Sequence, residues 1–178
     1  MSQSFRSIRP KADEHLDYYS MYIDRVPDGD IVAKLESQLP ETLAFLRSIP
    51  ESKHDHRYAP GKWSIKEIVG HLSDGERVFQ YRAFRFSRAD TTPVPGFEEN
   101  DYVANAPFSR MSMQDLISEF EHLRHATVRM ISALDEDAMG LRGTANGHEI
   151  TVRALAWIMA GHVDHHEEIL RKRYLSDS

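Results

Sequence analysis

The feature that most restricts the fold is a helical segment near the C-terminus, residues 155–170, with the sequence LAWIMAGHVDHHEEIL. At about 100° per residue, its apolar side chains and two of its histidines fall within an arc of roughly 120°, the width of a core-facing stripe. His162 and His166 lie in the middle of that arc, one helical turn apart. This spacing allows two imidazoles to bind one metal ion, whereas His165 lies at the edge of the arc.

Two interpretations of this histidine pair compete. A single histidine on an apolar face is usually a core residue that is hydrogen-bonded to a carbonyl group. Two stacked histidines are harder to explain in this way, because each buried imidazole needs partners for both of its ring nitrogens. The pair alone therefore leaves metal binding and ordinary core packing equally open.

Length and composition indicate an ordinary globular protein whose 178 residues form a single domain, residues 1–178. The net charge of −6 and the lack of a Lys/Arg run argue against a nucleic-acid partner. No apolar run approaches the roughly 18 residues of a membrane span, and no apolar segment follows the charged N-terminus. We therefore expect no membrane partner, no signal peptide and a cytoplasmic location. Because the chain has no cysteine, any metal site must use histidine and carboxylate side chains.

Four long amphipathic segments predict an all-α four-helix bundle. The clearest helix start is the capping box of Ser64 and Glu67, which is followed directly by apolar periodicity. Pro40 falls inside the first segment, but the apolar phase continues across it, which favours one kinked helix over two separate helices. The four segments run from about residue 30 to 48, 64 to 86, 112 to 135 and 151 to 174.

Shorter segments complete the predicted architecture. Residues 1–14 are expected to form a loose N-terminal lead, and a short helix with an apolar side follows. We interpret the aromatic cluster of this short helix as packing rather than as a binding site; it consists of Tyr18, Tyr19 and Tyr22. Asn146-Gly147 is a tight-turn signal that predicts a small hairpin before the last helix.

One long connection, residues 88–111, separates the second and third long helices. It holds three prolines, one glycine and four acidic residues, and it sustains no helical or strand period. Loops of this length inside a compact domain are usually functional or disordered. It is either a plain crossover, the somewhat simpler interpretation, or a crossover that also covers a site.

Two polar residues interrupt the apolar pattern of the second long helix, since Glu76 projects into its middle and His71 at its border. A buried carboxylate needs a cation or hydrogen-bond donors, so Glu76 either serves a polar site or pairs with an arginine of another helix. Arg124, at the border of the third helix's stripe, either pairs with Glu76 or holds an anionic substrate. If the second and fourth helices are neighbours, His71 can meet His162 and His166 around one ion.

The same residues resemble a known family. The strings WSIKEIVGHLSDGE (63–76) and GHVDHHEEIL (161–170) resemble the DinB-like superfamily of metal-dependent helical bundles, and the resemblance covers roughly residues 15–175. It implies that the metal triad consists of His71, His162 and His166, and the sequence shows no departure at these positions. Because dimers are frequent in this superfamily, the resemblance also implies a homodimer.

The resemblance implies an enzyme with one divalent metal ion, zinc by abundance, with nickel or iron as alternatives. Its reaction on a small-molecule substrate would be hydrolysis or the transfer of a low-molecular-weight thiol such as bacillithiol or mycothiol. Glu76 is then the candidate general base or supporting carboxylate, and His165 is a second catalytic candidate. The alternative is a non-catalytic bundle in which the ion stiffens the fold or a small ligand is held. A closed structural zinc site needs a fourth protein ligand, which Glu76 could supply.

Overall fold

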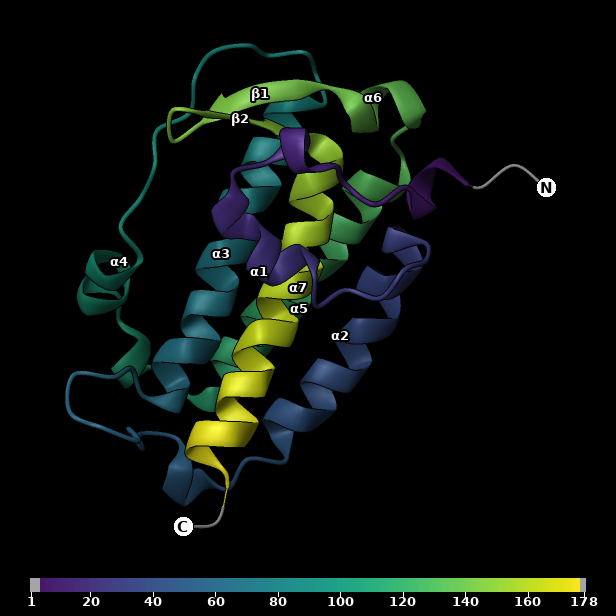
Figure 1. Ribbon diagram of the computed structural model, residues 1–178. Coiled ribbons are helices and arrows are strands. Elements are labelled where there is room, and N and C mark those ends of the chain that lie inside the picture. Colours follow the sequence, from purple (N-terminus) through teal and green to yellow (C-terminus); the bar gives the residue numbers. More distant parts are fainter. Residues whose placement is uncertain (1–3, 177–178) are drawn as a thin grey trace.

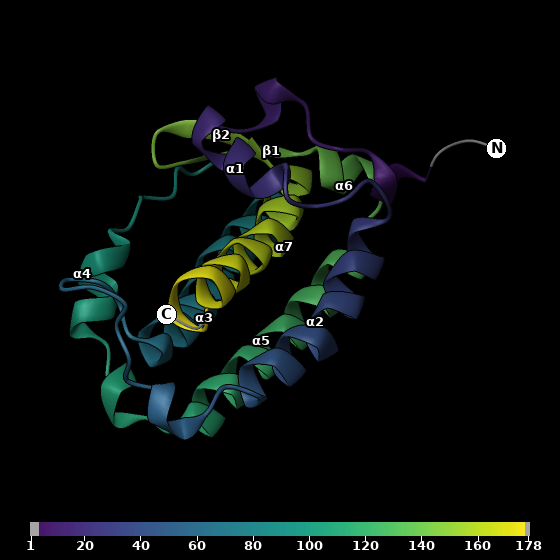
Figure 2. The same cartoon turned by 60° about the horizontal axis from the view of Figure 1, so that its bottom comes forward.

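The computed structural model describes residues 4–176 and has the predicted all-α architecture, a four-helix bundle with a small hairpin at one end (Figure 1). α3 packs against α5 and α7, and α2 packs against the same two helices. Figure 2 shows α3 beside α7 and α2 beside α5. No helix among residues 4–176 combines the length and the apolar character that crossing a membrane requires. The long helices are α2 (Ile31–Arg47), α3 (Ile65–Phe86), α5 (Met113–Ser132) and α7 (Val152–Ile169), which η6 (Leu170–Tyr174) continues as a π-helix.

The long helices begin where the sequence pattern predicts, because side chains cap their first turns. Backbone N–H groups of these turns donate hydrogen bonds to the side chains of Asp30, Ser64, Ser112 and Thr151. At α3 the capping box is complete, since the carboxylate of Glu67 also accepts a hydrogen bond from the Ser64 backbone N–H. α2 continues through Pro40 as one helix, as the unbroken apolar phase predicts.

The bundle core has two apolar clusters with a buried polar layer between them. One cluster lies at the hairpin end and the other at the opposite end. Along each long helix, the side chains at the border between the clusters are polar and buried. This polar layer consists of Gln38 on α2, Glu76 on α3, Arg124 and Thr127 on α5, and His162 on α7.

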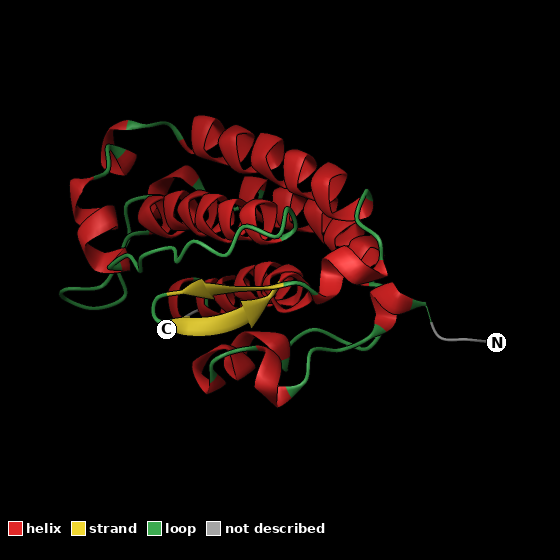
Figure 3. Cartoon of the chain, turned by 90° about the horizontal axis from the view of Figure 1, so that it is seen from above, coloured by secondary structure: helices red, strands yellow, loops and turns green. Residues whose placement is uncertain are grey.

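The hairpin prediction is confirmed, since β1 (Arg142–Ala145) pairs antiparallel with β2 (His148–Thr151). Asn146 and Gly147 form the turn, and both have positive φ angles, 52° and 77°. Such a turn matches the twist of the two strands. The hairpin lies at the top of the bundle in Figure 1, and Figure 3 shows its two strands from above.

The long crossover differs from the irregular segment that the sequence predicts, because it contains α4 (Glu99–Asn105) and the 3-10 turn η5 (Phe108–Arg110). The side chain of Glu98 caps α4 by accepting a hydrogen bond from the Asn100 N–H. Val103 is the buried residue of α4. A helix of two turns with so little buried surface leaves no apolar period in the sequence, which explains why the sequence did not predict it.

The crossover is tied to the hairpin near its start. The Val94 N–H donates to the Thr144 carbonyl oxygen at 2.8 Å, and the Asn146 N–H donates to the Val94 carbonyl oxygen at 3.0 Å. These two bonds fix the crossover beside the hairpin turn, and from there it runs along the side of the bundle to α4 (Figure 1).

The N-terminal part of the chain lies across α7 (Figure 1). The predicted short helix is α1 (Ser20–Ile23), preceded by the 3-10 turn η3 (Asp17–Tyr19). α1 approaches α7 so closely that a Cβ atom on Gly161 would lie 2.0 Å from the Tyr22 carbonyl oxygen. The remaining elements are η1 (Phe5–Ser7), η2 (Ala12–Glu14), η4 (Glu51–Lys53) and α6 (Glu136–Gly140).

Residues 4–14 of the expected loose lead contact the bundle, while residues 1–3 lie outside the described residues. The buried carboxylate of Glu14 accepts hydrogen bonds from Thr151 Oγ1 at 2.8 Å and from Arg153 Nε at 3.0 Å. The Arg9 guanidinium lies over the ring of Trp157, 4.7 Å from its centroid. These contacts join the start of the chain to the hairpin and to α7.

Candidate metal centre

Three buried histidines meet between α3 and α7. His71 comes from α3, while His162 and His166 come from successive turns of α7. Each offers one ring nitrogen, and these three nitrogens all lie within 4.8 Å of one another. The Nε2 atoms of His71 and His162 are 3.0 Å apart. The structure thus brings together the three histidines that the sequence indicated.

Burial keeps the three imidazoles neutral. It lowers the pKa of His71 to about 4, with the nearby His165 as a smaller cause. It also lowers the pKa of His162 and of His166 well below the ordinary value, and neighbouring histidines add to both shifts. A neutral imidazole has a lone pair for a metal ion, whereas a protonated one has none. Three lone-pair donors are therefore available here at neutral pH.

The donor set fits a divalent transition-metal ion. Three imidazoles suit zinc, nickel, iron or copper, and three protein ligands leave a position for water or substrate. The Nδ1 atoms of His71 and His166 are buried, and neither has a hydrogen-bond partner among residues 4–176. Ordinary core histidines use such atoms in hydrogen bonds. The Nε2 atoms of His71 and His162 moreover face each other rather than a carbonyl group, and this convergence favours the metal-ligand interpretation over core packing.

A close helix approach and aromatic rings hold the histidines in place. Gly75 of α3 faces His162, and a Cβ atom there would lie 2.6 Å from the imidazole Cε1. The ring of Tyr22 meets His162 edge-on at a centroid distance of 5.4 Å, and the ring of Trp63 lies 4.7 Å from that of His71. These contacts pack against the imidazoles and restrict their rotation.

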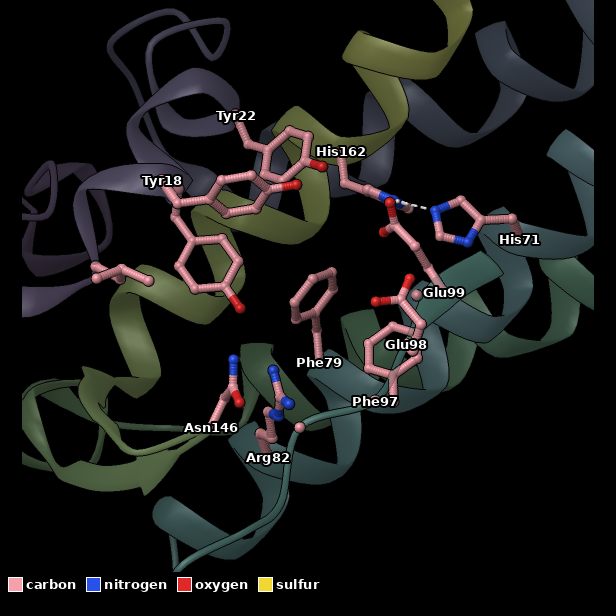
Figure 4. Close-up of a pocket in the computed structure, with 14 residues that line it drawn as sticks. Tyr18, Tyr22, His71, Phe79, Arg82, Phe97, Glu98, Glu99, Asn146 and His162 are labelled. Carbon is pink, nitrogen blue, oxygen red and sulfur yellow. Dashed lines mark hydrogen bonds between the residues drawn. The ribbon is translucent and has the colours of Figure 1, made fainter. Parts of the chain in front are cut away.

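A cavity of about 390 Å³ has His71 and His162 in its wall (Figure 4). This volume lies within the range of small-molecule sites. Figure 4 shows Glu98 and Glu99 on the same side as the histidines, and Arg82 and Asn146 at the other end. The aromatic part of the wall is formed by Tyr18, Tyr19, Tyr22, Phe79 and Phe97. The tyrosine cluster interpreted from the sequence as packing therefore also lines a cavity.

The crossover forms part of the cavity wall through residues 96–99. Glu99 lines this cavity and also a second one, of about 210 Å³, whose wall includes His166. Its carboxylate thus lies between two openings that lead to the triad. Burial raises the pKa of Glu99, and the neighbouring Glu98 adds to the rise. Of the two interpretations of the crossover, the structure favours the one in which it covers a site.

Glu76 and Arg124 pair with each other in the buried polar layer, outside the residues that line the cavity. Arg124 Nε and Nη2 each donate to one carboxylate oxygen of Glu76, both at 2.9 Å. Arg124 also donates to Gln38 Oε1 at 2.7 Å and to the Met159 carbonyl oxygen at 3.2 Å. Of the two interpretations that the sequence left open for each residue, this arrangement corresponds to the one in which Glu76 and Arg124 form an ion pair. It occupies the oxygen atoms that a general base or metal ligand would use.

His165 lies next to the triad rather than within it. Its ring centroid is 5.0 Å from that of His166 and 5.3 Å from that of Tyr22. Burial lowers its pKa, and Arg25 lowers it further. His165 is not among the residues that line the larger cavity.

Three polar groups of the cavity were not predicted from the sequence. Tyr22 was assigned to packing, and Glu99 lies in the acid-rich part of the crossover, where no period fixes its direction. Arg82 had a detectable signal, because it follows Phe79 by three residues and precedes Phe86 by four, which places it on the apolar stripe of α3. A charge on such a stripe indicates a buried polar function, as it did for Glu76.

Sequence comparisons identify relatives of this chain. A family model for the DinB superfamily matches residues 34–170. A protein of Oceanobacillus iheyensis, named as a candidate metal-dependent hydrolase, is 26% identical over 133 residues, and the match covers 73% of each chain. The part of the chain that matches the family model includes all three histidines of the triad.

Two solved structures are similar in fold. YfiT from Bacillus subtilis, described as a probable metal-dependent hydrolase with an unusual four-helix bundle topology, matches with a TM-score of 0.68 at 16% identity and 93% coverage of both chains. A mycothiol-dependent maleylpyruvate isomerase matches with a TM-score of 0.65 at 15% identity. That match covers 82% of this chain and 61% of the isomerase. At these identities the likeness shows a shared bundle fold.

Proposed function

The chain belongs to the DinB superfamily, and on that premise we propose that it is a hydrolase of small molecules with one divalent metal ion on His71, His162 and His166. The observation that carries the proposal is the convergence of three neutral imidazoles, two of which, His71 and His162, stand in the wall of a cavity of about 390 Å³. When bound, such an ion acts as a Lewis acid that makes water or a thiol a better nucleophile near neutral pH.

Residues of the cavity supply the remaining chemistry in this proposal. The carboxylate of Glu99 points towards His162 in Figure 4, and one of its oxygens accepts the proton of the attacking water. Tyr22 keeps its hydroxyl proton, because burial and then the nearby Tyr18 hydroxyl raise its pKa well above the ordinary range. Its hydroxyl can therefore donate a hydrogen bond to a substrate oxygen on which negative charge develops.

Transfer of a low-molecular-weight thiol is the second candidate function. The fold likeness to a mycothiol-dependent enzyme favours it. Hydrolysis ranks first because a half-buried carboxylate stands on the triad side of the cavity, where a base for water is needed. The choice of zinc as the ion, the cytoplasmic location and the homodimer stay predictions from the sequence and from the family resemblance.

Metal content tests the ligand assignment. We expect elemental analysis of the purified protein to find one divalent ion per chain, and we expect His162→Ala to lose it. His122→Ala removes an exposed histidine of α5 and is the matched control, which should keep the ion. Full metal stoichiometry in His162→Ala would show that the ligand assignment is wrong.

Turnover assays test the reaction. A panel of small esters and amides, together with thiol-transfer assays, is run with and without a chelator. We expect hydrolysis that the chelator abolishes. Thiol transfer without hydrolysis would favour the second candidate. A chelator that lowers the Tm while neither reaction is detected would favour a non-catalytic bundle stiffened by its ion.

A further inference from the structure

Arg82 of α3 is a buried cation without a carboxylate partner among residues 4–176. Its exposed fraction is 2%. Within the described part of the chain, its Nη2 atom donates to the Pro95 carbonyl oxygen at a long 3.3 Å, and its Nε atom has no hydrogen-bond partner. Burying a charge is costly unless an opposite charge and hydrogen bonds compensate it. The position of Arg82 therefore indicates that a partner is supplied from outside the chain.

The second buried arginine of the bundle provides the contrast. Arg124 is also fully buried, but its guanidinium donates to both carboxylate oxygens of Glu76, to Gln38 and to a backbone carbonyl. Its N–H donors are thus satisfied by the protein itself. Most N–H groups of Arg82, in contrast, have no such partner within residues 4–176. A guanidinium presents its N–H groups in a planar fork that matches a carboxylate.

Arg82 lines the cavity at the end away from the histidines, beside the side-chain amide of Asn146 (Figure 4). The carboxylates of the same cavity, Glu98 and Glu99, lie on the histidine side, and neither forms an ion pair with Arg82. Glu98 instead accepts hydrogen bonds from the backbone and side chain of Asn100. Aromatic rings line the space between the two ends.

We propose that Arg82 and Asn146 form an anion-binding end of the cavity, and that the substrate is a small molecule with an apolar body and a carboxylate group. The carboxylate binds the guanidinium fork of Arg82, and the apolar body lies against the aromatic walls. The bond that reacts then lies towards His71 and His162. This inference names a substrate class and rests on the proposed function only for what happens at the histidine end.

The test compares two ligands of nearly equal shape that differ in charge. Binding of phenylacetate and of its neutral analogue phenylacetamide is measured by ligand-detected NMR titration, on the purified protein and again after metal removal by a chelator. The second arm isolates the Arg82 end, because a carboxylate cannot then bind an ion at the triad. In both arms we expect phenylacetate to bind about 10- to 100-fold more tightly, the usual range for a hydrogen-bonded ion pair.

Variants assign the preference to Arg82. Arg82→Met should remove the preference for phenylacetate while binding of phenylacetamide is unchanged, and Arg82→Lys should keep part of it. Arg88→Met removes an exposed arginine just beyond the end of α3 and should keep the full preference. Thermal unfolding verifies that Arg82→Met is folded, and its Tm should be equal or higher because an unpaired buried charge is removed.

Several outcomes would overturn the inference: equal binding of both ligands, binding of neither, or a preference that survives Arg82→Met. The outcomes also separate this inference from the proposed function. Metal-dependent hydrolysis without any preference for carboxylates would support the function and overturn the anion site. A carboxylate preference without any turnover would support the anion site and count against the hydrolase.

Discussion

Gly75 is the residue at which the smallest possible change should disturb the metal centre. A Cβ atom there would lie 2.6 Å from Cε1 of His162, so Gly75→Ala must displace the imidazole. The overlap costs about 1–3 kcal/mol, and the better helix propensity of alanine offsets about 1 kcal/mol of that. We therefore expect a folded protein whose metal affinity is reduced by about 10- to 100-fold, measured by metal retention during dialysis against a competing chelator.

Gly140→Ala is the matched control for this prediction. No atom lies within 4 Å of a Cβ atom at Gly140, which lies in α6. This variant should keep both its ion and its Tm. If Gly75→Ala retained metal as strongly as Gly140→Ala, His162 would not be held against α3 in the way that the structure shows.

The histidine triad could be predicted from the sequence, but the rest of the cavity could not. His162 and His166 are on one helix, where the period alone fixes the angle between their side chains. Glu99 and Tyr22 are on segments whose direction depends on tertiary contacts, namely the crossover bonds at Val94 and the close contact between α1 and α7. Their meeting with the triad is a property of the fold rather than of any local pattern.

The buried ion pair of Glu76 and Arg124 connects the four long helices. Arg124 of α5 bonds to Glu76 of α3, to Gln38 of α2 and to the Met159 carbonyl oxygen of α7. Gln38 in turn donates to the Ala160 carbonyl oxygen of α7 at 2.9 Å. Since these bonds require one alignment along the bundle axis, the polar layer specifies the register of the helices.

Removal of one partner of this pair should cost far more than removal of both. We expect Glu76→Leu to lower the free energy of unfolding by about 3–5 kcal/mol, because it leaves the Arg124 charge buried and unpaired. In the double variant Glu76→Leu/Arg124→Leu much of this loss should be regained. Chemical denaturation of Glu76→Leu, of Arg124→Leu and of the double variant measures the coupling energy between the two side chains directly.

The same variants examine the catalytic role that the sequence suggested for Glu76. A base with no structural role would give a Glu76→Leu protein of unchanged stability and lost turnover. Loss of stability with metal content retained would instead assign Glu76 to the register of the helices. Equal stability of all three variants would contradict the role of the polar layer described above.

The four long helices, their caps and the hairpin were predictable because each has a local signal. Caps at Ser64 and Thr151 satisfy orphan N–H groups within one turn, and Asn146-Gly147 adopts the positive φ angles that its residue types favour. α4 has no such signal beyond its cap at Glu98, since it is short and Val103 is its buried residue. Local sequence signals therefore predicted the four-helix scaffold, whereas the position of the crossover depends on its hydrogen bonds to the hairpin at Val94.

The N-terminal segment packs across α7 and contributes one wall of the cavity. It is attached to the hairpin and to α7 through Glu14, Thr151 and Arg153, and it continues into the tyrosines of η3 and α1 that line the cavity. Loss of the Glu14 contacts should therefore lower the free energy of unfolding and increase the mobility of the cavity wall. The titration of Glu14 makes this contribution measurable.

Burial alone would raise the pKa of Glu14, but hydrogen bonds from Arg153 and Thr151 outweigh it and hold the pKa below its ordinary value of 4.5. A lowered folded-state pKa stabilises the protein in full above the unfolded-state pKa, and this stabilisation is lost as the pH falls through the folded-state pKa. Glu14→Gln should therefore unfold about 1–3 kcal/mol more easily than wild type at pH 7, measured by urea denaturation. The difference should stay constant down to about pH 5.5 and shrink below the ordinary pKa of Glu14. Glu149→Gln, which removes an exposed carboxylate of β2, should differ little from wild type throughout, and a Glu14→Gln deficit that grew on acidification would contradict the assignment.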